Sequence, residues 1–297
     1  MSSSATVPQV DDDRIGRWIA RAMLTVPAAG SVAAIALAVI YGLSGTAVLL
    51  FVAMYVVTMA GVEIGMHRYF SHRAFKCSPA LRLALGIAGS MAGQGPVLFW
   101  AATHRRHHRY SDTESDPHAP LGRSLAAFWR AHVGWMTEKH HYEPGAAVPD
   151  LLRDRATLAA QRHYLTWFAL GLLLPALVGL AAAGTWYGAL EGLLWGGLLR
   201  VFAVHHVTWS VNSLCHLFGA KPWQSRDDSG NIFWLALPTL GGAWHNNHHA
   251  FPACATTSLG RWQLDPSGWL ISLAEAVGLV WDVRRPPART HLESRVR

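Results

Sequence analysis

Two long stretches without charge dominate the pattern of hydrophobic and polar positions along the chain. The first runs from Ala22 to Val62 and the second from Tyr164 to Leu190, and neither contains Asp, Glu, Lys, Arg or His. A membrane-spanning helix needs about 20 apolar residues. The first stretch therefore accommodates two spans, joined by a turn at residues 41–45, where glycine and serine interrupt it. A single long core helix is the alternative, and this central turn disfavours it.

The second stretch is followed by a largely apolar segment, 191–211, which Glu191, Arg200, His205 and His206 interrupt. Together they predict two further spans with a turn at residues 184–188. We expect the four spans at about 22–41, 46–66, 164–183 and 188–210. Arg200 would lie inside the last span, where a charge is costly and normally faces protein or water. Two interpretations of Arg200 stay open, a polar anchor near a functional site and a buried structural ion pair.

The remaining segments are more polar and predict a cap at one end of the spans. Glycines and a proline break residues 80–100, which favours an amphipathic segment at the membrane interface over a further span. Residues 67–163 and 211–285 would form the cap. The prediction is a single domain over residues 14–285, with a disordered N-terminal tail at 1–13 and a C-terminal tail at 286–297.

Composition supports a membrane protein and narrows the partners. Of the 297 residues, 51% are hydrophobic and 14% are charged, which is too apolar for an ordinary soluble domain. The net charge of +7 alone would suggest nucleic acid, but the apolar stretches make the lipid bilayer the better partner. Neither predicted turn between spans holds Lys or Arg, so the positive-inside rule places both termini and the cap in the cytoplasm. The three cysteines show no metal or disulfide spacing.

Histidines in four separated segments carry the candidate chemistry. Two segments have the pattern HxxHH, and on a helix positions i, i+3 and i+4 share one face, so each would present three imidazoles together. A third segment holds His67 and His72, which are five residues apart. On an α-helix they would be roughly 140° out of phase, which suggests a frayed helix end or an inward turn. The remaining segment has a single histidine, His216, and Asn212 lies four residues before it. The nine histidines are His67, His72, His104, His107, His108, His216, His245, His248 and His249.

Nine grouped histidines exceed what one metal ion needs, because a protein metal site takes about three or four ligands. The number indicates two metal ions with four or five histidines each. Metal-bound histidines usually need an acceptor for their second ring nitrogen, and Glu63, one turn before His67, is a candidate; others are Asp112, Asp116, Asp227 and Asp228. Five histidines lack the paired spacing and are expected at the surface or in supporting positions: His118, His132, His140, His141 and His163.

These motifs resemble the membrane acyl-CoA desaturases of the stearoyl-CoA Δ9 type. The segments HRYFSH, HRRHH, NSLCHLFG and HNNHHAFP match in order and spacing, and the likeness runs from about Gly61 to Trp281. The resemblance implies an all-α integral membrane fold with four transmembrane helices and a cytosolic helical cap that holds a histidine-ligated di-iron site. It implies a reaction that uses O2 and two external electrons to place a cis double bond, at Δ9, in a saturated acyl-CoA.

The resemblance also implies roles for individual residues. The nine histidines would bind two Fe ions, Asn212 would approach one iron through water, and no catalytic side chain is implied beyond these ligands. Gln94, Trp100 and Thr208 match the positions at which the family bends the acyl chain. On the second predicted span, Tyr55 and Met59 would close the far end of the tunnel, although ordinary packing also explains them.

The sequence departs from the family at the acyl carrier and lacks an electron-transfer module. The animal enzymes have Arg-Asp before their second cluster and Gly-Glu-Gly before the last; here the residues are Ala102-Thr103 and Gly241-Gly242-Ala243. An acyl-CoA, another acyl thioester or an acyl lipid therefore all stay open as substrates. Arg105, Arg106 and Arg109 could bind phosphates or simply be solvated. No haem motif is fused, so a separate donor such as a ferredoxin, a cytochrome b5-like protein or a flavin reductase is implied.

Two other functions compete with desaturation. A di-iron hydroxylase acting on a lipid or an alkane could use the same histidines and return oxygen to the substrate. A metal transporter would need histidines at mid-depth in the spans, where only His205 and His206 approach that position.

Overall fold

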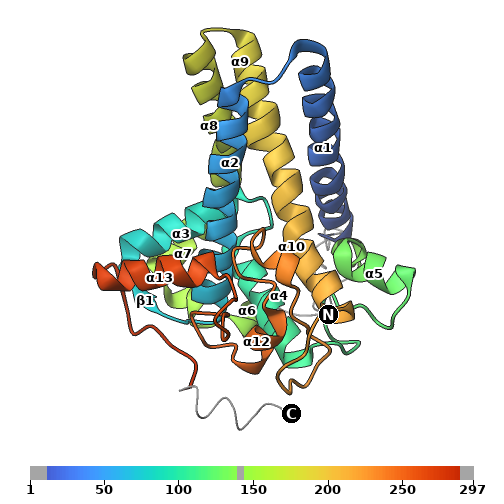
Figure 1. Ribbon diagram of the computed structural model, residues 1–297, viewed down its shortest axis with the longest axis vertical. Coiled ribbons are helices and arrows are strands. Elements are labelled where there is room, and N and C mark those ends of the chain that lie inside the picture. The colour runs from blue at the N-terminus through green and yellow to red at the C-terminus, as the bar shows by residue number, and fades with distance from the viewer. Residues whose placement is uncertain (1–11, 139–143, 288–297) are drawn as a thin grey trace, which may run out of the picture.

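The four predicted spans form an upright bundle with the cap at one end (Figure 1). The computed structural model describes residues 12–138 and 144–287. Within these ranges four helices are long and apolar enough to cross a membrane, and they comprise residues Gly16–Tyr41, Gly45–Ser71, Tyr164–Ala183 and Trp186–Leu217. The helical fold class with four candidate membrane spans is therefore confirmed. The helices that carry histidines extend beyond the predicted limits into the cap.

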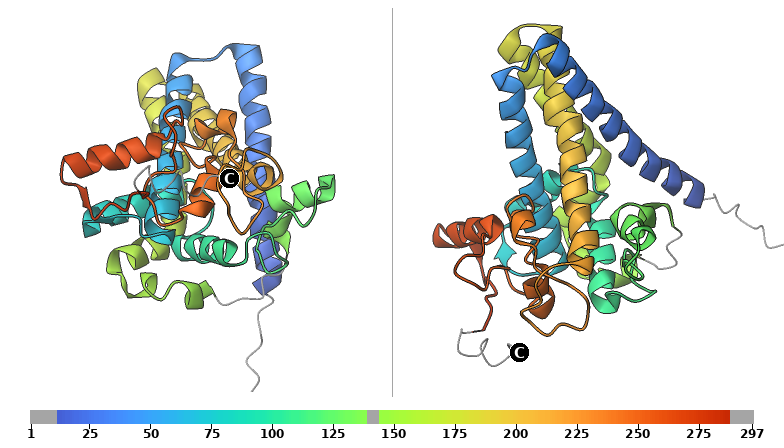
Figure 2. Two further views of the ribbon diagram at one scale, coloured as in Figure 1. Left: turned by 60° about the horizontal axis from the view of Figure 1, so that its bottom comes forward. Right: turned by 45° about the vertical axis from the view of Figure 1, so that its right-hand side comes forward.

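The first two spans are α1 (Asp12–Tyr41) and α2 (Gly45–Ala60), and α2 continues without a break into the π-helix η1 (Gly61–Ser71). Gly42 has a positive φ of 87°, which glycine adopts at little cost, and the Ser44 hydroxyl accepts a hydrogen bond from the Ala47 amide to begin α2. The predicted turn at 41–45 is thus present. Figure 2 shows α1 leaning away from α2 at its cap end.

The third and fourth spans are joined by the second predicted turn. Helix α8 (Tyr164–Ala183) ends at Gly184, which has a φ of 66°, and Thr185 caps α9 (Trp186–Glu191) by accepting from the Gly188 amide. The chain then passes through a second π-helix, η4 (Gly192–Leu199), into α10 (Arg200–Leu217). Glycines let α8 and η4 approach closely, because a Cβ at Gly192 would meet the Pro175 carbonyl.

Arg200 is fully buried but is not part of an ion pair with any carboxylate in the described ranges. Its guanidinium donates to the carbonyl oxygens of Gly196, Met91 and Gly171 at 3.1, 2.7 and 2.6 Å. Arg200 therefore joins α10 to α8 and to the end of α3 (Pro79–Met91). The interpretation as a buried ion pair is wrong, because backbone carbonyls supply the acceptors.

The cap is built from short helices and one small sheet. The segment 80–100 contains α3 (Pro79–Met91), which is too short to be a span, and α4 (Val97–Tyr110) follows after a turn containing Gly93 and Gly95. The other helices of the cap are α5 (Leu125–His132), η2 (Gly134–Thr137), α6 (Pro144–Ala147), η3 (Leu151–Arg153), α7 (Arg155–Arg162), α11 (Phe233–Ala236), α12 (His245–Ala250) and α13 (Pro266–Ala276). Strands β1 (Lys76–Cys77) and β2 (Val280–Trp281) pair antiparallel and join the two halves of the cap.

The predicted tails fall mostly outside the described residues. Residues 1–11 and 288–297 are not described, nor are His140 and His141. Asp12 and Asp13, which we assigned to the N-terminal tail, belong to α1.

We expect Gly192→Val to separate α8 from η4 and destabilise the protein. Overpacking of this kind costs about 1–3 kcal/mol. The effect is measured as a lower thermal midpoint in detergent. Gly16→Val is the matched control, because a Cβ at Gly16 has no neighbour within 4 Å. Equal midpoints for the two variants would contradict this account of the contact.

Candidate metal centre

The π-helical geometry of η1 brings together two histidines that an α-helix would separate. In η1 the His72 amide donates to the His67 carbonyl at 3.2 Å, an i→i+5 hydrogen bond. The wider turn places residues five apart above each other, and the two imidazole centroids are 5.0 Å apart. The expected helix end is present, because η1 stops at Ser71 and His72 lies in the turn that follows, but the end is a π-helix. Our estimate of the phase assumed about 3.6 residues per turn, which does not apply to η1.

The nine histidines converge into two groups. The first histidine group has five members, the second has four, and in each the candidate ligand atoms lie within 4.8 Å of one another. Facing Nε2 atoms are 2.8 Å apart for His72 and His104, and 2.9 Å apart for His216 and His245. The first group is His67, His72, His104, His108 and His248; the second is His107, His216, His245 and His249.

Each HxxHH segment contributes to both groups instead of presenting three imidazoles to one site. In α4, His104 and His108 belong to the first group and His107 to the second. In α12, His245 and His249 belong to the second group and His248 to the first. Positions i+3 and i+4 of an α-helix point roughly 100° apart, so adjacent histidines reach different sites. Helices α4 and α12 thereby tie the two groups together.

Carboxylates hold four of the histidines by their second ring nitrogen. Glu63 accepts from His67 Nδ1 at 2.9 Å, and Asp116 accepts from His107 Nδ1 at 2.9 Å. A carboxylate at Nδ1 leaves the Nε2 lone pair free to face the group. Asp112 and Asp227 hold His216 and His249 in the same way, at 3.0 and 2.6 Å.

Asp228, the remaining candidate acceptor, contacts Lys221 and not a histidine. It supports His216 indirectly, because its backbone amide donates to Asp112 Oδ2 at 2.6 Å.

The histidines outside the two groups lie in different surroundings. His118 is buried with its ring 4.4 Å from that of His107, whereas His163 is exposed. His132 bonds to Ser213 and His206, both at 3.0 Å.

Burial keeps most of the grouped imidazoles neutral. Removal from water, followed by repulsion from neighbouring imidazoles, holds their pKa well below the usual range; this applies to His72, His104, His108, His245, His248 and His249. The neutral ring is the form that binds a metal ion. Neutral imidazole donors in groups of five and four suit a pair of transition-metal ions such as iron.

A pocket with partly apolar walls opens onto both histidine groups. Its lining includes His67 and His104 of the first group, His107 and His245 of the second, and Asn212 of α10. Met59, Val62 and Val211 supply apolar walls; Glu63, Trp100, Thr208, Thr239 and Gly242 complete the lining. Asn212 thus lines the same pocket as histidines of both groups.

The three residues proposed to bend the chain lie around this pocket. Trp100 stacks on His104 with ring centroids 5.1 Å apart and donates through its indole nitrogen to Gln94 Oε1 at 3.2 Å. The buried Thr208 hydroxyl has no hydrogen-bond partner among the described residues. Gln94 is not in the lining, and its contact with the pocket wall is this hydrogen bond to Trp100. Tyr55 is also not in the lining; its hydroxyl donates to the Pro238 carbonyl at 2.7 Å.

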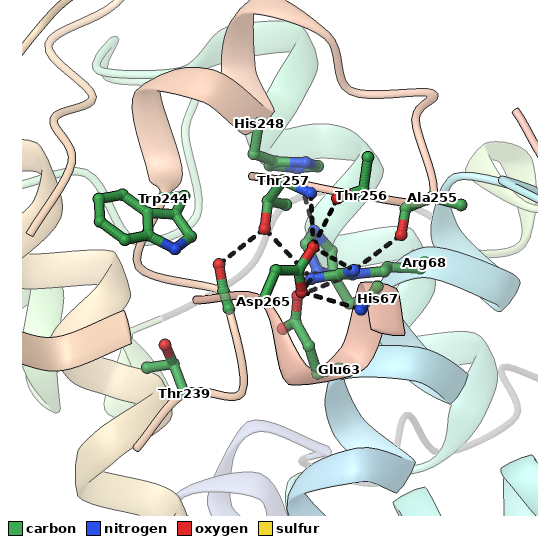
Figure 3. A network of polar contacts seen from close by, with 12 residues as sticks. Glu63, His67, Arg68, Thr239, Trp244, His248, Ala255, Thr256, Thr257 and Asp265 are labelled. Atoms are coloured by element: carbon green, nitrogen blue, oxygen red, sulfur yellow. Dashed lines mark hydrogen bonds and ion pairs between the residues drawn. The ribbon is translucent and has the colours of Figure 1, made fainter. Parts of the chain in front are cut away.

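A buried arginine that sequence reasoning missed joins the first histidine group to the C-terminal part of the cap (Figure 3). Arg68 donates to Glu63 Oε1 at 3.1 Å and to Asp265 Oδ1 at 2.8 Å. It also donates to the Ala255 carbonyl at 2.7 Å. Burial raises the pKa of Asp265, but Arg68 and backbone amides lower it more, so the net value is below the usual range. Two features of the sequence could have indicated this pair. Arg68 lies between His67 and His72, and Asp265 lies just before Pro266.

Side-chain amides support the short helix α12, which has only six residues. Asn231 Oδ1 accepts from the backbone amides of Asn246 and Asn247 at 3.0 and 3.2 Å, satisfying the first turn. Asn247 Oδ1 accepts from the Trp223 indole at 2.8 Å, and its Nδ2 donates to Gln263 at 2.8 Å. These bonds compensate for the marginal stability of a short helix.

The residues at the carrier-binding positions of the animal enzymes offer no polar surface. Ala102 and Thr103 are buried. Arg105 is engaged by acceptors that include Asp150 Oδ1 at 2.6 Å, the Ser71 carbonyl at 2.9 Å and the Phe70 carbonyl at 2.9 Å. The interpretation of Arg105 as a phosphate ligand is therefore wrong, because these partners already occupy its guanidinium.

The fold and the site define a protein with four candidate membrane spans and two polyhistidine groups, each able to hold a metal ion, beside an apolar-walled pocket. The family model for fatty acid desaturases matches residues 43–266. The chain belongs to the fatty acid desaturase family and is accordingly an oxidoreductase of the desaturase type.

Relatives in this family include proteins named for different acyl carriers. The chain is 44% identical to a hex-5-enoyl-acyl-carrier-protein acetylenase of Moorena producens, over 89% of this chain and 85% of the relative. It is 38% identical to an sn-1 stearoyl-lipid 9-desaturase of Synechocystis, over 79% and 70%. It is 34% identical to Delta-9 acyl-lipid desaturase 1 of Arabidopsis thaliana, over 78% and 73%.

The division of the histidines predicts different metal losses from adjacent substitutions. His248→Ala should weaken the first group and His249→Ala the second, each lowering the content from about two to about one metal ion per chain. Elemental analysis gives the content, and spectroscopy of the remaining ion distinguishes the two sites. His163→Ala is the control. Equal metal content in all three variants would contradict the assignment.

We expect Asp265→Asn to lower the free energy of unfolding by about 3–5 kcal/mol, because it leaves the buried Arg68 with one carboxylate partner fewer. Denaturant titration in detergent measures the change. Asp282→Asn is the control, because Asp282 pairs with Lys76 at the surface, where both side chains are over 60% exposed. A loss of stability no larger than that of the control would show that Glu63 alone suffices for Arg68.

Proposed function

We propose that the protein is an O2-dependent fatty acyl desaturase that places a cis double bond in a saturated acyl chain at a di-iron centre. The observation that carries the proposal is the pair of polyhistidine groups at an apolar-walled pocket in a chain of the desaturase family. The overall reaction takes two hydrogens from the acyl chain and reduces O2 to two waters with two external electrons and two protons.

The nine histidines would hold two iron ions, and Asn212 would hold a water beside the second. When bound, the iron pair supplies the oxygen activation that removal of an unactivated hydrogen requires. The protein's own contribution is orientation. Glu63, Asp112, Asp116 and Asp227 each hold one imidazole in the tautomer that presents Nε2. Burial of the groups excludes bulk water from the reacting centre.

The pocket lining would hold one C–C bond of the chain against the metals. Trp100, fixed by Gln94 and stacked on His104, forms a rigid wall, and the unpaired Thr208 hydroxyl faces the same space. Positioning of this kind places the reacting atoms in near-attack geometry. Met59 lines the pocket on the α2 side and would influence chain length. Two relatives named as 9-desaturases support the Δ9 position.

The carrier that the structure supports best is a membrane lipid and not CoA. Ala102, Thr103 and the engaged Arg105 offer no binding site for a charged head group. Two relatives are named for acyl-lipid substrates, whereas a third is named for a substrate on acyl-carrier protein. The electron donor would be a separate ferredoxin, cytochrome b5-like protein or flavin reductase. The uncharged turns between the spans support a cytoplasmic cap, at which such a donor would dock.

A second candidate is an acetylenase, which removes two hydrogens from an existing double bond. The 44% identity to a protein with that name favours it. Both candidates would use the same site; they differ in the substrate chain that the pocket accepts and, by the name of that relative, in the acyl carrier.

Expression with a compatible reductase, followed by mass spectrometry of the acyl chains, tests the proposal. Desaturation predicts O2-dependent loss of two hydrogens from a saturated chain, and acetylenase activity predicts the same loss from an unsaturated one. His107→Ala should abolish either product, since His107 belongs to the second group. Gain of an oxygen atom would instead identify a hydroxylase, and full activity of His107→Ala would refute the ligand assignment.

A further inference from the structure

The segment that carries α11 exposes large apolar side chains. Phe233, Trp234 and Leu237 are 67%, 65% and 58% exposed. The opposite side of the same segment is buried, with Leu235 and Ala236 packed against Cys215. Three adjacent exposed side chains of this size would be unfavourable in water.

The depth of this segment follows from its contact with α2. The Tyr55 hydroxyl donates to the Pro238 carbonyl at 2.7 Å. Tyr55 follows Gly45, the first residue of α2, by ten positions, which corresponds to about 15 Å along the helix. The hydrocarbon core of a bilayer is about 30 Å thick. Pro238 therefore lies near mid-depth, provided that α2 begins at the membrane boundary.

The outer surface of α2 supports this depth. Val48 and Leu49, close to the start of the helix, are 42% and 67% exposed, and Val56 and Val57 are 43% and 48% exposed. Apolar side chains thus face outward from the first turn of α2 to a level just past Tyr55. Lipid at that level would also surround the exposed side of α11.

The backbone of the segment is suited to hydrocarbon, where unpaired amides and carbonyls are costly. The Ile232 amide donates to the Ala243 carbonyl at 2.9 Å, and the Gly241 amide donates to the Ala236 carbonyl at 2.8 Å. The Thr239 amide donates to the Leu235 carbonyl at 3.1 Å, and its hydroxyl accepts from the Ala243 amide at 3.0 Å. The non-helical turn after α11 therefore pairs its polar groups within the protein.

The same segment forms a wall of the pocket. Thr239 and Gly242 line the pocket directly, and Leu240 packs in one cluster with Met59 and Val62. Residues 233–242 therefore have an outward face of exposed apolar side chains and an inward face at the metal centre.

We propose that residues 233–242 are inserted in the bilayer and form the wall through which a lipid acyl chain enters the pocket sideways. The insertion stands on exposure and depth alone, and the entry route rests on the proposed function. The ligand is an acyl chain dissolved in the membrane, in place of one delivered from water on a soluble carrier.

Photo-crosslinking in phospholipid nanodiscs tests the insertion. With p-benzoylphenylalanine in place of Leu237, illumination should give a covalent adduct with a lipid acyl chain, identified by mass spectrometry. The same replacement of Gln224, an exposed residue on a polar loop of the cap, is the control. We expect at least a several-fold higher adduct yield at position 237, and equal yields would overturn the insertion.

A phospholipid with a diazirine at mid-chain tests the entry route in the wild-type protein. Labelling of Thr239 and Met59 in addition to Leu237 supports lateral entry, and labelling of Leu237 alone overturns it. Neither experiment requires turnover or an electron donor. With these labels present, absence of a desaturated product when the protein is expressed with a compatible reductase would therefore refute the proposed function and leave the insertion standing.

Discussion

The structure depends on holding neutral imidazoles in a buried space with their lone pairs turned toward one another. Without metal ions such an arrangement is unfavourable, because the lone pairs repel and the ring nitrogens have lost their water. The protein offsets this with carboxylates placed behind the rings. Glu63, Asp112, Asp116 and Asp227 come from three different segments and each bonds one histidine at Nδ1. These carboxylates therefore orient the imidazoles of both histidine groups.

The helices that carry the histidines are irregular or short, and each has a compensating contact. The π-helix η1 aligns His67 with His72, and the glycines on its α3 side allow close packing; a Cβ at Gly61 would meet the Ala88 backbone. Helix α12 has six residues and is fixed by Asn231 and Asn247. Arg68 connects the two regions through Glu63 and Asp265 (Figure 3). A small change in this frame would move ligands of both groups, since α4 and α12 each serve both.

The substrate side and the metal side of the site are built from the same spans. Helix α2 carries Met59 at the pocket and continues into η1 with its histidines, and α10 carries Thr208, Asn212 and His216 on successive turns. A chain lying along these helices would meet the metals at their cap end. This continuity explains how a membrane-dissolved chain and a buried metal centre can share one pocket.

The sequence by itself determined the four spans, the two turns between them, the nine histidines and Glu63 as an acceptor. These features depend on local composition and on residues within one or two turns, so they are visible along the chain. The family was equally accessible, because its motifs are short and ordered.

Only the tertiary structure decided how the histidines divide into five and four. Helical periodicity identifies a shared face, but it does not say which of His107 and His108 meets His249 from the far end of the chain. The π-helical turn at His67, the pairing of Arg68 with Asp265 and the carbonyl partners of Arg200 were likewise inaccessible. Each depends on contacts between residues far apart in sequence, or on a backbone geometry that those contacts stabilise.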